Sequence, residues 1–204
     1  MSAASGTGAE RVVGVVLCGG RSRRLGRDKA LLDWGGRPLM SVVAEALSSG
    51  GCPQVAAVTR PGHLDGMDLA TLGVSRVILD QWADEGPFAG VLSALEELGD
   101  VDVVVLSCDL PLVTPGTVSR LISTEGPVAV ADDGRLQPLV ACYRSEAVEL
   151  LREAWDAGER SLRRTLDVAG AARVPVEPGE LDDVDTVEQE AELRRRADLT
   201  RLQG

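Results

Sequence analysis

Short apolar runs rich in valine alternate along the chain with segments whose apolar residues recur every three or four positions. The short runs are typical of buried strands, which we expect at Val12–Cys18, Val55–Thr59, Arg76–Leu79, Val101–Ser107, Val128–Ala131 and Leu139–Tyr143. The periodic segments predict helices at Pro38–Ser49, Phe88–Leu98, Thr114–Ile122, Ala147–Ala157, Leu162–Val168 and Val187–Leu199. Strands that alternate with helices predict an α/β fold, with a mostly parallel central sheet and helices on both of its faces.

One connection departs from this alternation. The turn sequence DDGR, residues 132–135, separates two strand-like runs directly, which predicts a β-hairpin arm in place of another βαβ unit. We find no internal repeat and no low-complexity linker. With 204 residues in all, we expect one domain over residues 11–204, preceded by a flexible tail at residues 1–10.

Composition narrows the class of protein. Hydrophobic residues make up 44% and aromatic residues 2%, so the core must be mainly aliphatic. The formal net charge of −11 argues against binding to nucleic acid or to an anionic membrane. No apolar stretch approaches the length of a membrane span, and the small polar N-terminal residues do not resemble a secretory signal, so we expect a cytoplasmic protein.

The cysteine and histidine residues give little indication of a metal site or of nucleophilic catalysis. The four cysteines are far apart in the sequence and form no CxxC pair. Three of them, Cys18, Cys108 and Cys142, stand in or beside apolar strand-like runs and are interpreted as reduced, buried thiols. The single histidine, His63, stands in the loop-like stretch PGHLDG. Neither a histidine-rich metal site nor a histidine-based triad is therefore expected.

A basic, glycine-rich loop follows the first predicted strand directly, with the sequence LCGGRSRRLGRDK. It matches neither a Walker A motif nor the dinucleotide pattern GxGxxG. Glycines without side chains let backbone N–H groups approach phosphate oxygens, and Arg23, Arg24 and Lys29 could balance the phosphate charge. The alternative is a surface turn with solvated arginines.

Aspartates stand where predicted strands end, which is where open α/β sheets bind their ligands. Asp109 ends the most continuously apolar strand and Asp80 ends another. A carboxylate next to a phosphate loop is a usual ligand of Mg²⁺, although either residue could simply cap a turn. Further along, Asp182, Asp183 and Asp185 are either a second group of metal ligands or an acidic turn before the last helix.

These residues together resemble the molybdenum cofactor guanylyltransferase family. The opening stretch LCGGRSRRLGRDKALLDWGGRPL is similar to the start of that family, and the later stretches DQWADEGPFAG, SCDLPLV, QPLVACY, DAGERSL and DDVDT match family segments in the same order. The resemblance covers nearly the whole chain after the tail. It implies a single-domain, Rossmann-like nucleotidyltransferase fold.

The resemblance also implies an activity and roles for individual residues. The family transfers GMP from GTP to molybdopterin or Mo-molybdopterin, which releases pyrophosphate. By this similarity, the nucleotide would contact eight positions, namely Leu17, Cys18, Gly19, Gly20, Lys29, Thr59, Asp80 and Asp109. Asp109 and Asp185 would hold Mg²⁺. Asp183 and Asp185 stand where some relatives have asparagine, which keeps an oxygen ligand but adds charge.

The implied chemistry needs no catalytic histidine, because the terminal phosphate of the acceptor is already nucleophilic near neutral pH. The protein must instead align the reactants and neutralise charge on the α-phosphate and the departing pyrophosphate. Lys29, Arg23, Arg24 and Mg²⁺ on Asp109 are expected to do this.

Three alternatives remain at this point. A cytidylyltransferase would use the same chemistry on the same pterin, although such relatives tend to have AAG where this chain has CGG. A sugar-1-phosphate nucleotidyltransferase shares the loop and the strand-end aspartate but commonly has a longer chain. A non-catalytic protein could deliver the cofactor to molybdoenzymes or their chaperones. The resemblance suggests a pterin pocket between Gln137-Pro138 and Arg160-Ser161.

Overall fold

A computed structural model describes residues 11–19 and 27–201 of the chain. The strands in this part of the chain are β1 (Val12–Leu17), β2 (Gln54–Thr59), β3 (Arg76–Leu79), β4 (Asp102–Ser107), β5 (Val128–Asp132), β6 (Leu136–Tyr143) and β7 (Ala172–Pro175). The helices are α1 (Leu39–Ser49), α2 (Pro87–Leu98), α3 (Pro115–Ser123), α4 (Ala147–Asp156), α5 (Leu162–Val168) and α6 (Val187–Arg201).

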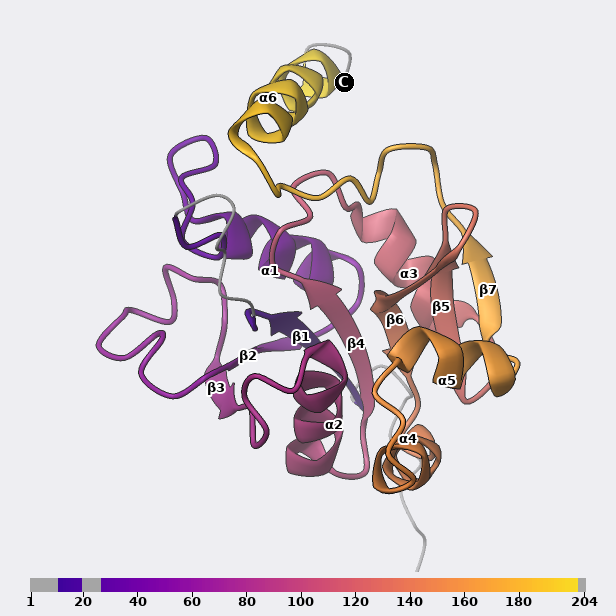
Figure 1. Cartoon of the computed structure of the whole chain (residues 1–204). Coiled ribbons are helices and arrows are strands. Elements are labelled where there is room, and N and C mark those ends of the chain that lie inside the picture. Colours follow the sequence, from indigo (N-terminus) through magenta and orange to yellow (C-terminus); the bar gives the residue numbers. More distant parts are fainter. Residues whose placement is uncertain (1–10, 20–26, 202–204) are drawn as a thin grey trace, which may run out of the picture.

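The strands form one sheet in the order β3-β2-β1-β4-β6-β5-β7. The first four strands in this order are parallel to one another, β6 is antiparallel to both β4 and β5, and β7 is parallel to β5. The mostly parallel α/β sheet is therefore confirmed, as is the hairpin. Both strands of the hairpin lie within the central sheet (Figure 1).

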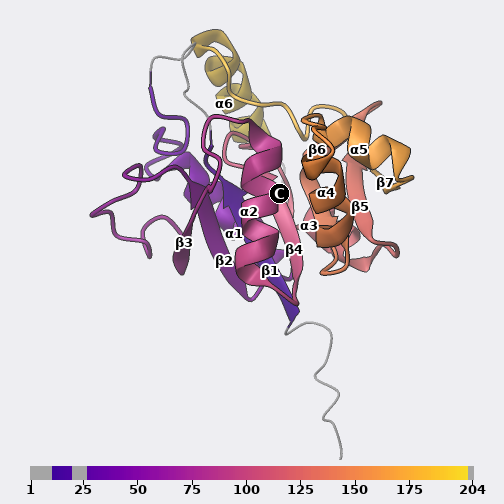
Figure 2. The ribbon, with the colours of Figure 1, turned by 60° about the horizontal axis from the view of Figure 1, so that its bottom comes forward.

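Helices cover both faces of the sheet, as predicted (Figures 1 and 2). Side chains of β1 alternate between the two faces: Val12 and Val16 join the core beneath α1 and α3, whereas Val15 and Leu17 join the core beneath α2, α4 and α5. A third, smaller apolar cluster lies beneath α6 and contains Leu32, Trp34, Leu39, Val184 and Leu193.

Most element boundaries agree with the sequence predictions to within one or two residues. Thr114 caps α3, since its Oγ1 accepts a hydrogen bond from the N–H of Thr117 at 3.2 Å. Pro38 was expected in the first turn of α1, but its backbone is extended and the helix begins at the next residue. β6 begins at Leu136, earlier than its apolar run suggests, because it pairs with β5 directly after the turn.

β7 was not predicted at all. It has only four residues, ends in proline and lies at the edge of the sheet, where a proline is tolerated because no neighbouring strand needs its N–H. The expected tail at residues 1–10 lies outside the described residues. No helix in the described part of the chain is both long and apolar enough to span a membrane.

Candidate functional site

Asp109 lies immediately beyond β4, at the edge of the sheet where the parallel strands end. The backbone N–H of Cys108 bonds to the carbonyl of Leu17 at 3.2 Å and so joins the ends of β4 and β1. The Asp109 carboxylate accepts a bond from Ser107 Oγ at 2.5 Å and one from Lys29 Nζ at 2.8 Å. The side chains of Lys29 and Asp109 are each only 15% exposed, so the ion pair is mostly shielded from water.

The connection between β7 and α6, residues 176–186, brings two more carboxylates to this point; we call it the strap. The N–H of Val184 donates to the backbone carbonyl of Asp109 at 3.0 Å, and the Val184 side chain is fully buried. This bond places the residues on either side, Asp183 and Asp185, next to Asp109. One carboxylate oxygen from each of the three aspartates lies within 4.8 Å of the others.

Lys29 contacts two of these carboxylates, since its ammonium also bonds to Asp185. Burial alone would lower the pKa of Lys29, but the adjacent Asp109 and Asp185 carboxylates outweigh burial and raise it. Partial burial raises the pKa of Asp183, and repulsion from Asp185 and Asp109 raises it further. Lys29 is therefore positively charged at neutral pH, inside a cluster of excess negative charge.

Asp80 follows β3 at the same edge of the sheet but turns toward α2. Its Oδ1 accepts bonds from the N–H of Trp82 at 3.0 Å and from Ser93 Oγ at 3.4 Å. Burial is the main cause of its raised pKa. Gly90 keeps this corner compact, because a Cβ there would lie 2.6 Å from Leu17 Cδ1 and 3.6 Å from Asp80 Oδ2. Asp80 thus lies beside the end of β1, in contact with α2.

The described part of the glycine loop presents its backbone at the end of β1. The side chains of Leu17 and Cys18 are buried on opposite faces of the sheet, and Gly19 is exposed with open space where a Cβ would be. Gly20, Arg23 and Arg24 lie outside the described residues, so their predicted phosphate contacts stay predictions.

His63 is a site residue that sequence reasoning missed. Its ring bonds through Nδ1 to Thr59 Oγ1 and through Nε2 to Asp28 Oδ2, and its side chain is only 6% exposed. Thr59 ends β2 and is itself buried. The hydroxyl that we expected to contact nucleotide is therefore engaged by His63. The only signal in the sequence was that the chain has a single histidine.

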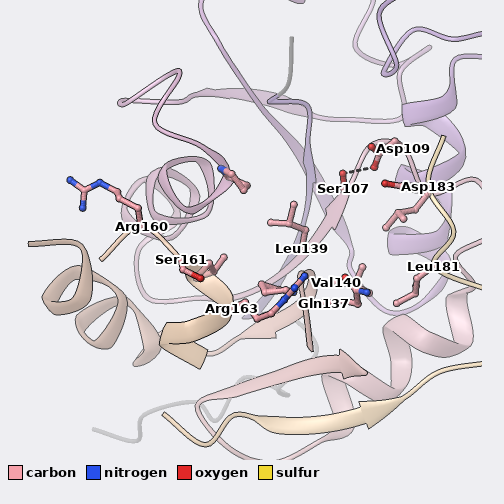
Figure 3. Close-up of a pocket in the computed structure, with 14 residues that line it drawn as sticks. Ser107, Asp109, Gln137, Leu139, Val140, Arg160, Ser161, Arg163, Leu181 and Asp183 are labelled. Atoms are coloured by element: carbon pink, nitrogen blue, oxygen red, sulfur yellow. Dashed lines mark hydrogen bonds between the residues drawn. The ribbon is translucent and has the colours of Figure 1, made fainter. Parts of the chain in front are cut away.

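A pocket of about 440 Å³ opens beside the carboxylates, between β4, β6 and α5 (Figure 3). It is lined by Pro87, Ser107, Asp109, Leu110, Gln137, Pro138, Leu139, Val140, Arg160, Ser161, Leu162, Arg163, Leu181 and Asp183. Figure 3 shows Asp109 and Asp183 at one end and Arg160 and Ser161 at the other. The walls include all four residues between which a pterin pocket was expected.

Cys18, Cys108 and Cys142 are buried and reduced, as predicted, and so is Cys52. Burial raises the pKa of the Cys52 thiol to about 12 and that of the Cys142 thiol to about 11. Thiols with such high pKa values hold few thiolates at neutral pH, so neither is suited to nucleophilic chemistry.

The chain is similar to proteins of one family over most of its length. Residues 14–174 match the family model described as a MobA-like NTP transferase domain. A molybdenum cofactor guanylyltransferase from Pseudomonas putida is 34% identical over 158 residues, which cover 74% of this chain and 80% of that protein. The chain belongs to the molybdenum cofactor guanylyltransferase family. A second member, from Ectopseudomonas mendocina, is 30% identical over 90% of this chain and 92% of its own length.

Solved structures of this family and its neighbours share the fold. Molybdopterin-guanine dinucleotide biosynthesis protein A from Archaeoglobus fulgidus superposes with a TM-score of 0.73, at 24% identity, over 92% of this chain and 98% of its own. A nucleotidyl transferase from Methanothermobacter superposes with a TM-score of 0.75, at 20% identity, over 93% of this chain and 99% of its own. The chain is thus a nucleotidyltransferase of Rossmann-like architecture, as the sequence resemblance implied.

Proposed function

We propose that this guanylyltransferase family member transfers GMP from GTP to molybdopterin or Mo-molybdopterin and releases pyrophosphate. A terminal phosphate oxygen of the acceptor attacks the α-phosphorus of GTP, and the bond to the β-phosphate breaks as pyrophosphate leaves with its electron pair. The observation that carries the proposal is the Lys29 ammonium held between Asp109 and Asp185, at the end of the glycine loop, with Asp109 also lining the pocket.

The carboxylate cluster fits Mg²⁺. Asp109, Asp183 and Asp185 offer hard oxygen donors, and one oxygen of each lies within 4.8 Å of the others. We propose that Asp109 and Asp185 hold the ion, with Asp183 beside them. Bound there, Mg²⁺ would neutralise charge on the phosphates of the nucleotide.

The protein's own residues align the reactants and balance charge. Lys29 is expected to face the phosphates, and its raised pKa keeps it protonated. Arg23 and Arg24 are expected to add positive charge to the same phosphates. No side chain has to remove a proton from the acceptor phosphate, because that phosphate is already ionised near neutral pH. The mechanism therefore rests on positioning and electrostatics.

We assign the acceptor to the pocket in Figure 3. Asp109 and Asp183 belong to its lining, so an acceptor bound there would hold its terminal phosphate near the metal site. The polar side chains of Gln137, Ser161 and Arg163 line the pocket with apolar residues of β6, a mixture that suits a pterin. Arg160 is directed elsewhere, with its guanidinium 3.8 Å from the centre of the Trp155 ring.

We assign the guanine and ribose to the backbone at the end of β1, at Leu17, Cys18 and Gly19, with Gly20 near the phosphates. Asp80 and Thr59 complete the nucleotide positions in this proposal. The second glycine of the CGG stretch favours guanine over cytosine. We further propose that the reaction takes place in the cytoplasm and that its product passes to molybdoenzymes or their chaperones.

Nucleotide choice is tested by thermal denaturation of the wild type with Mg²⁺ and GTP, CTP, UTP or ATP. A ligand that binds only the folded protein raises its melting temperature according to the ratio of concentration to Kd. We expect GTP alone to stabilise, and Lys29→Ala to lose most of that shift. A shift with CTP alone would replace guanylyl transfer by cytidylyl transfer.

Product analysis then tests the reaction itself. With Mo-molybdopterin, Mg²⁺ and radiolabelled GTP, the wild type should form a labelled dinucleotide and equimolar pyrophosphate. Binding of GTP without any product would favour the delivery protein over the enzyme.

A further inference from the structure

The His63 side chain forms the centre of a mostly buried chain of hydrogen bonds, and His63 itself has no role in the proposed reaction. It lies between Thr59, the last residue of β2, and Asp28, the residue before Lys29. Thr59 is 1% exposed, and the His63 side chain 6% exposed. Because both side chains are shielded, Thr59 and His63 cannot exchange these hydrogen bonds for bonds to water. Their hydrogen bonds are therefore a fixed feature of the fold.

The chemistry of the partners sets the direction of the hydrogen bonds. An ionised carboxylate only accepts, so His63 Nε2 carries the hydrogen and donates to Asp28. In the neutral ring Nδ1 then accepts from the Thr59 hydroxyl. The other oxygen of Asp28 accepts from the backbone N–H of Ala30 at 3.0 Å. The Asp28 carboxylate thus holds the backbone on both sides of Lys29 in relation to β2.

Three consecutive residues of this segment bond to three different parts of the molecule. Arg27 donates to Glu190 of α6 at 2.8 Å, Asp28 accepts from His63, and Lys29 bonds to Asp109 beyond β4. The Arg27 side chain is 55% exposed, so its ion pair is screened by water and holds the segment weakly. Asp28 therefore provides the more shielded of the two anchors that directly precede Lys29.

We infer that His63 is a positioning residue for Lys29, which acts through Asp28 and Thr59 without touching the nucleotide. This inference rests on the proposed function, because it assigns His63 to the same phosphate site. Without the imidazole, Asp28 loses its link to β2 and the Lys29 ammonium is less well placed. Misplacement of a group by about 1 Å is enough to lower a rate by about 100-fold.

A double-mutant cycle on turnover tests the inference. His63→Ala should lower kcat/KM for GTP at least about tenfold, mainly through kcat, in the wild-type background. In the Lys29→Ala background, measured by single-turnover transfer from radiolabelled GTP, the same change should have little further effect, since residues that act through one another are not additive. An equal fold-loss in both backgrounds would overturn the inference.

Two further variants separate positioning from general damage to the fold. Leu64→Ala is the matched control, because Leu64 is the next residue and is 4% exposed in the core. It should lower the melting temperature at least as much as His63→Ala but retain kcat/KM to within about twofold. His63→Gln, which keeps an N–H for Asp28, should recover part of the lost rate. If Leu64→Ala loses as much activity as His63→Ala, the inference is wrong.

Nitrogen-15 NMR of the imidazole gives a readout that is independent of activity. His63 is the only histidine of the chain, so its ring signals need no assignment. We expect Nε2 to carry a hydrogen in the wild type, and both ring nitrogen shifts to change in Asp28→Ala. Unchanged shifts in Asp28→Ala would refute the chain of bonds. If the shifts change as expected but the wild type forms no dinucleotide, the proposed function fails while the bonds around His63 stand.

Discussion

Lys29 and Asp109 form a shielded ion pair whose two charges both serve the proposed reaction. Lys29→Ala removes the cation proposed to face the phosphates, and Asp109→Ala removes a proposed metal ligand. We expect each to reduce guanylyl transfer by at least about two orders of magnitude, a typical loss for a single electrostatic stabiliser. Steady-state transfer to Mo-molybdopterin measures this. Arg37→Ala is the control, because Arg37 is 44% exposed and pairs with Glu45 on α1.

The control should keep wild-type turnover to within about twofold. Wild-type turnover in Asp109→Ala would contradict the assignment of the metal site. Wild-type turnover in Lys29→Ala would contradict the role of Lys29 at the phosphates.

Burial, together with repulsion from Asp185 and Asp109, disfavours the charged form of the Asp183 carboxyl and so raises its pKa. Asp183→Asn removes repulsion from Asp185 and Asp109 and keeps an oxygen, so the ligand-free protein should become slightly more stable at pH 7. Because the Asp183 side chain remains accessible to solvent despite this partial burial, we expect a gain of only a few tenths of a kcal/mol. Chemical denaturation measures it, and a less stable variant would contradict the repulsion.

The pH dependence of this gain follows from the sign of the pKa shift. A carboxyl whose pKa is raised in the folded protein binds its proton more tightly there than in the unfolded chain. Its unfavourable effect on folding therefore grows as pH rises from the ordinary pKa of 3.8 through the raised value, and it is constant above that. The stability difference between Asp183→Asn and the wild type should vanish below this window. A stability difference that persists at lower pH would show that it does not come from the ionised form of Asp183.

At the scale of elements, the strap carries two of the three carboxylates, and Glu180 fixes it to α3. The buried Glu180 carboxylate accepts bonds from the N–H of Thr114 at 3.2 Å, from Thr114 Oγ1 at 2.8 Å and from Thr117 Oγ1. Glu180→Ala should lower the free energy of unfolding by about 2 kcal/mol, as expected for lost hydrogen bonds to a charged group. It should also weaken the stabilisation by GTP and Mg²⁺, since Asp183 and Asp185 are less well held.

Glu177→Ala is the matched control for the strap, because Glu177 lies in the same segment with an exposed side chain. It should change neither stability nor ligand binding. Chemical denaturation together with ligand-induced thermal shifts measures both variants. Equal shifts in Glu180→Ala and the wild type would show that the strap positions its carboxylates without this anchor.

Strands and helices could be predicted wherever the local pattern of apolar and polar residues was long enough to identify them. β1 and β4 are nearly continuous apolar runs, as expected of central parallel strands, whereas the four residues of β7 contain no such signal. The same distinction applies to the candidate site, where some residues could be predicted from the local sequence and others could not. Asp109 could be predicted from the end of its own strand. Nothing local indicates that the N–H of Val184 bonds to Asp109 across 75 positions of sequence, or that His63 reaches back to Asp28.

At the scale of the whole molecule, the topology gathers the described part of the candidate site at one edge of the sheet. The ends of β1, β2, β3 and β4 bring the start of the glycine loop (Leu17 to Gly19), Thr59, Asp80 and Asp109 to this edge, while the starts of the same strands lie at the opposite edge. A bound ligand should therefore suppress local opening at the edge that carries the site more than at the opposite edge. Regions that open locally become protected only where a ligand contacts or orders them.

Hydrogen exchange measured by mass spectrometry tests this directly. Addition of GTP and Mg²⁺ should slow exchange in peptides over residues 27–33, 59–64, 107–111 and 181–186, and leave peptides over residues 50–54 and 99–103 nearly unchanged. The last two segments lead into β2 and β4, include the first residues of these strands and are the internal control. In Lys29→Ala the slowed exchange should disappear at the same ligand concentrations. Equal protection at both edges would mean that the nucleotide acts by stabilising the whole fold, and the proposed position of the site would then be wrong.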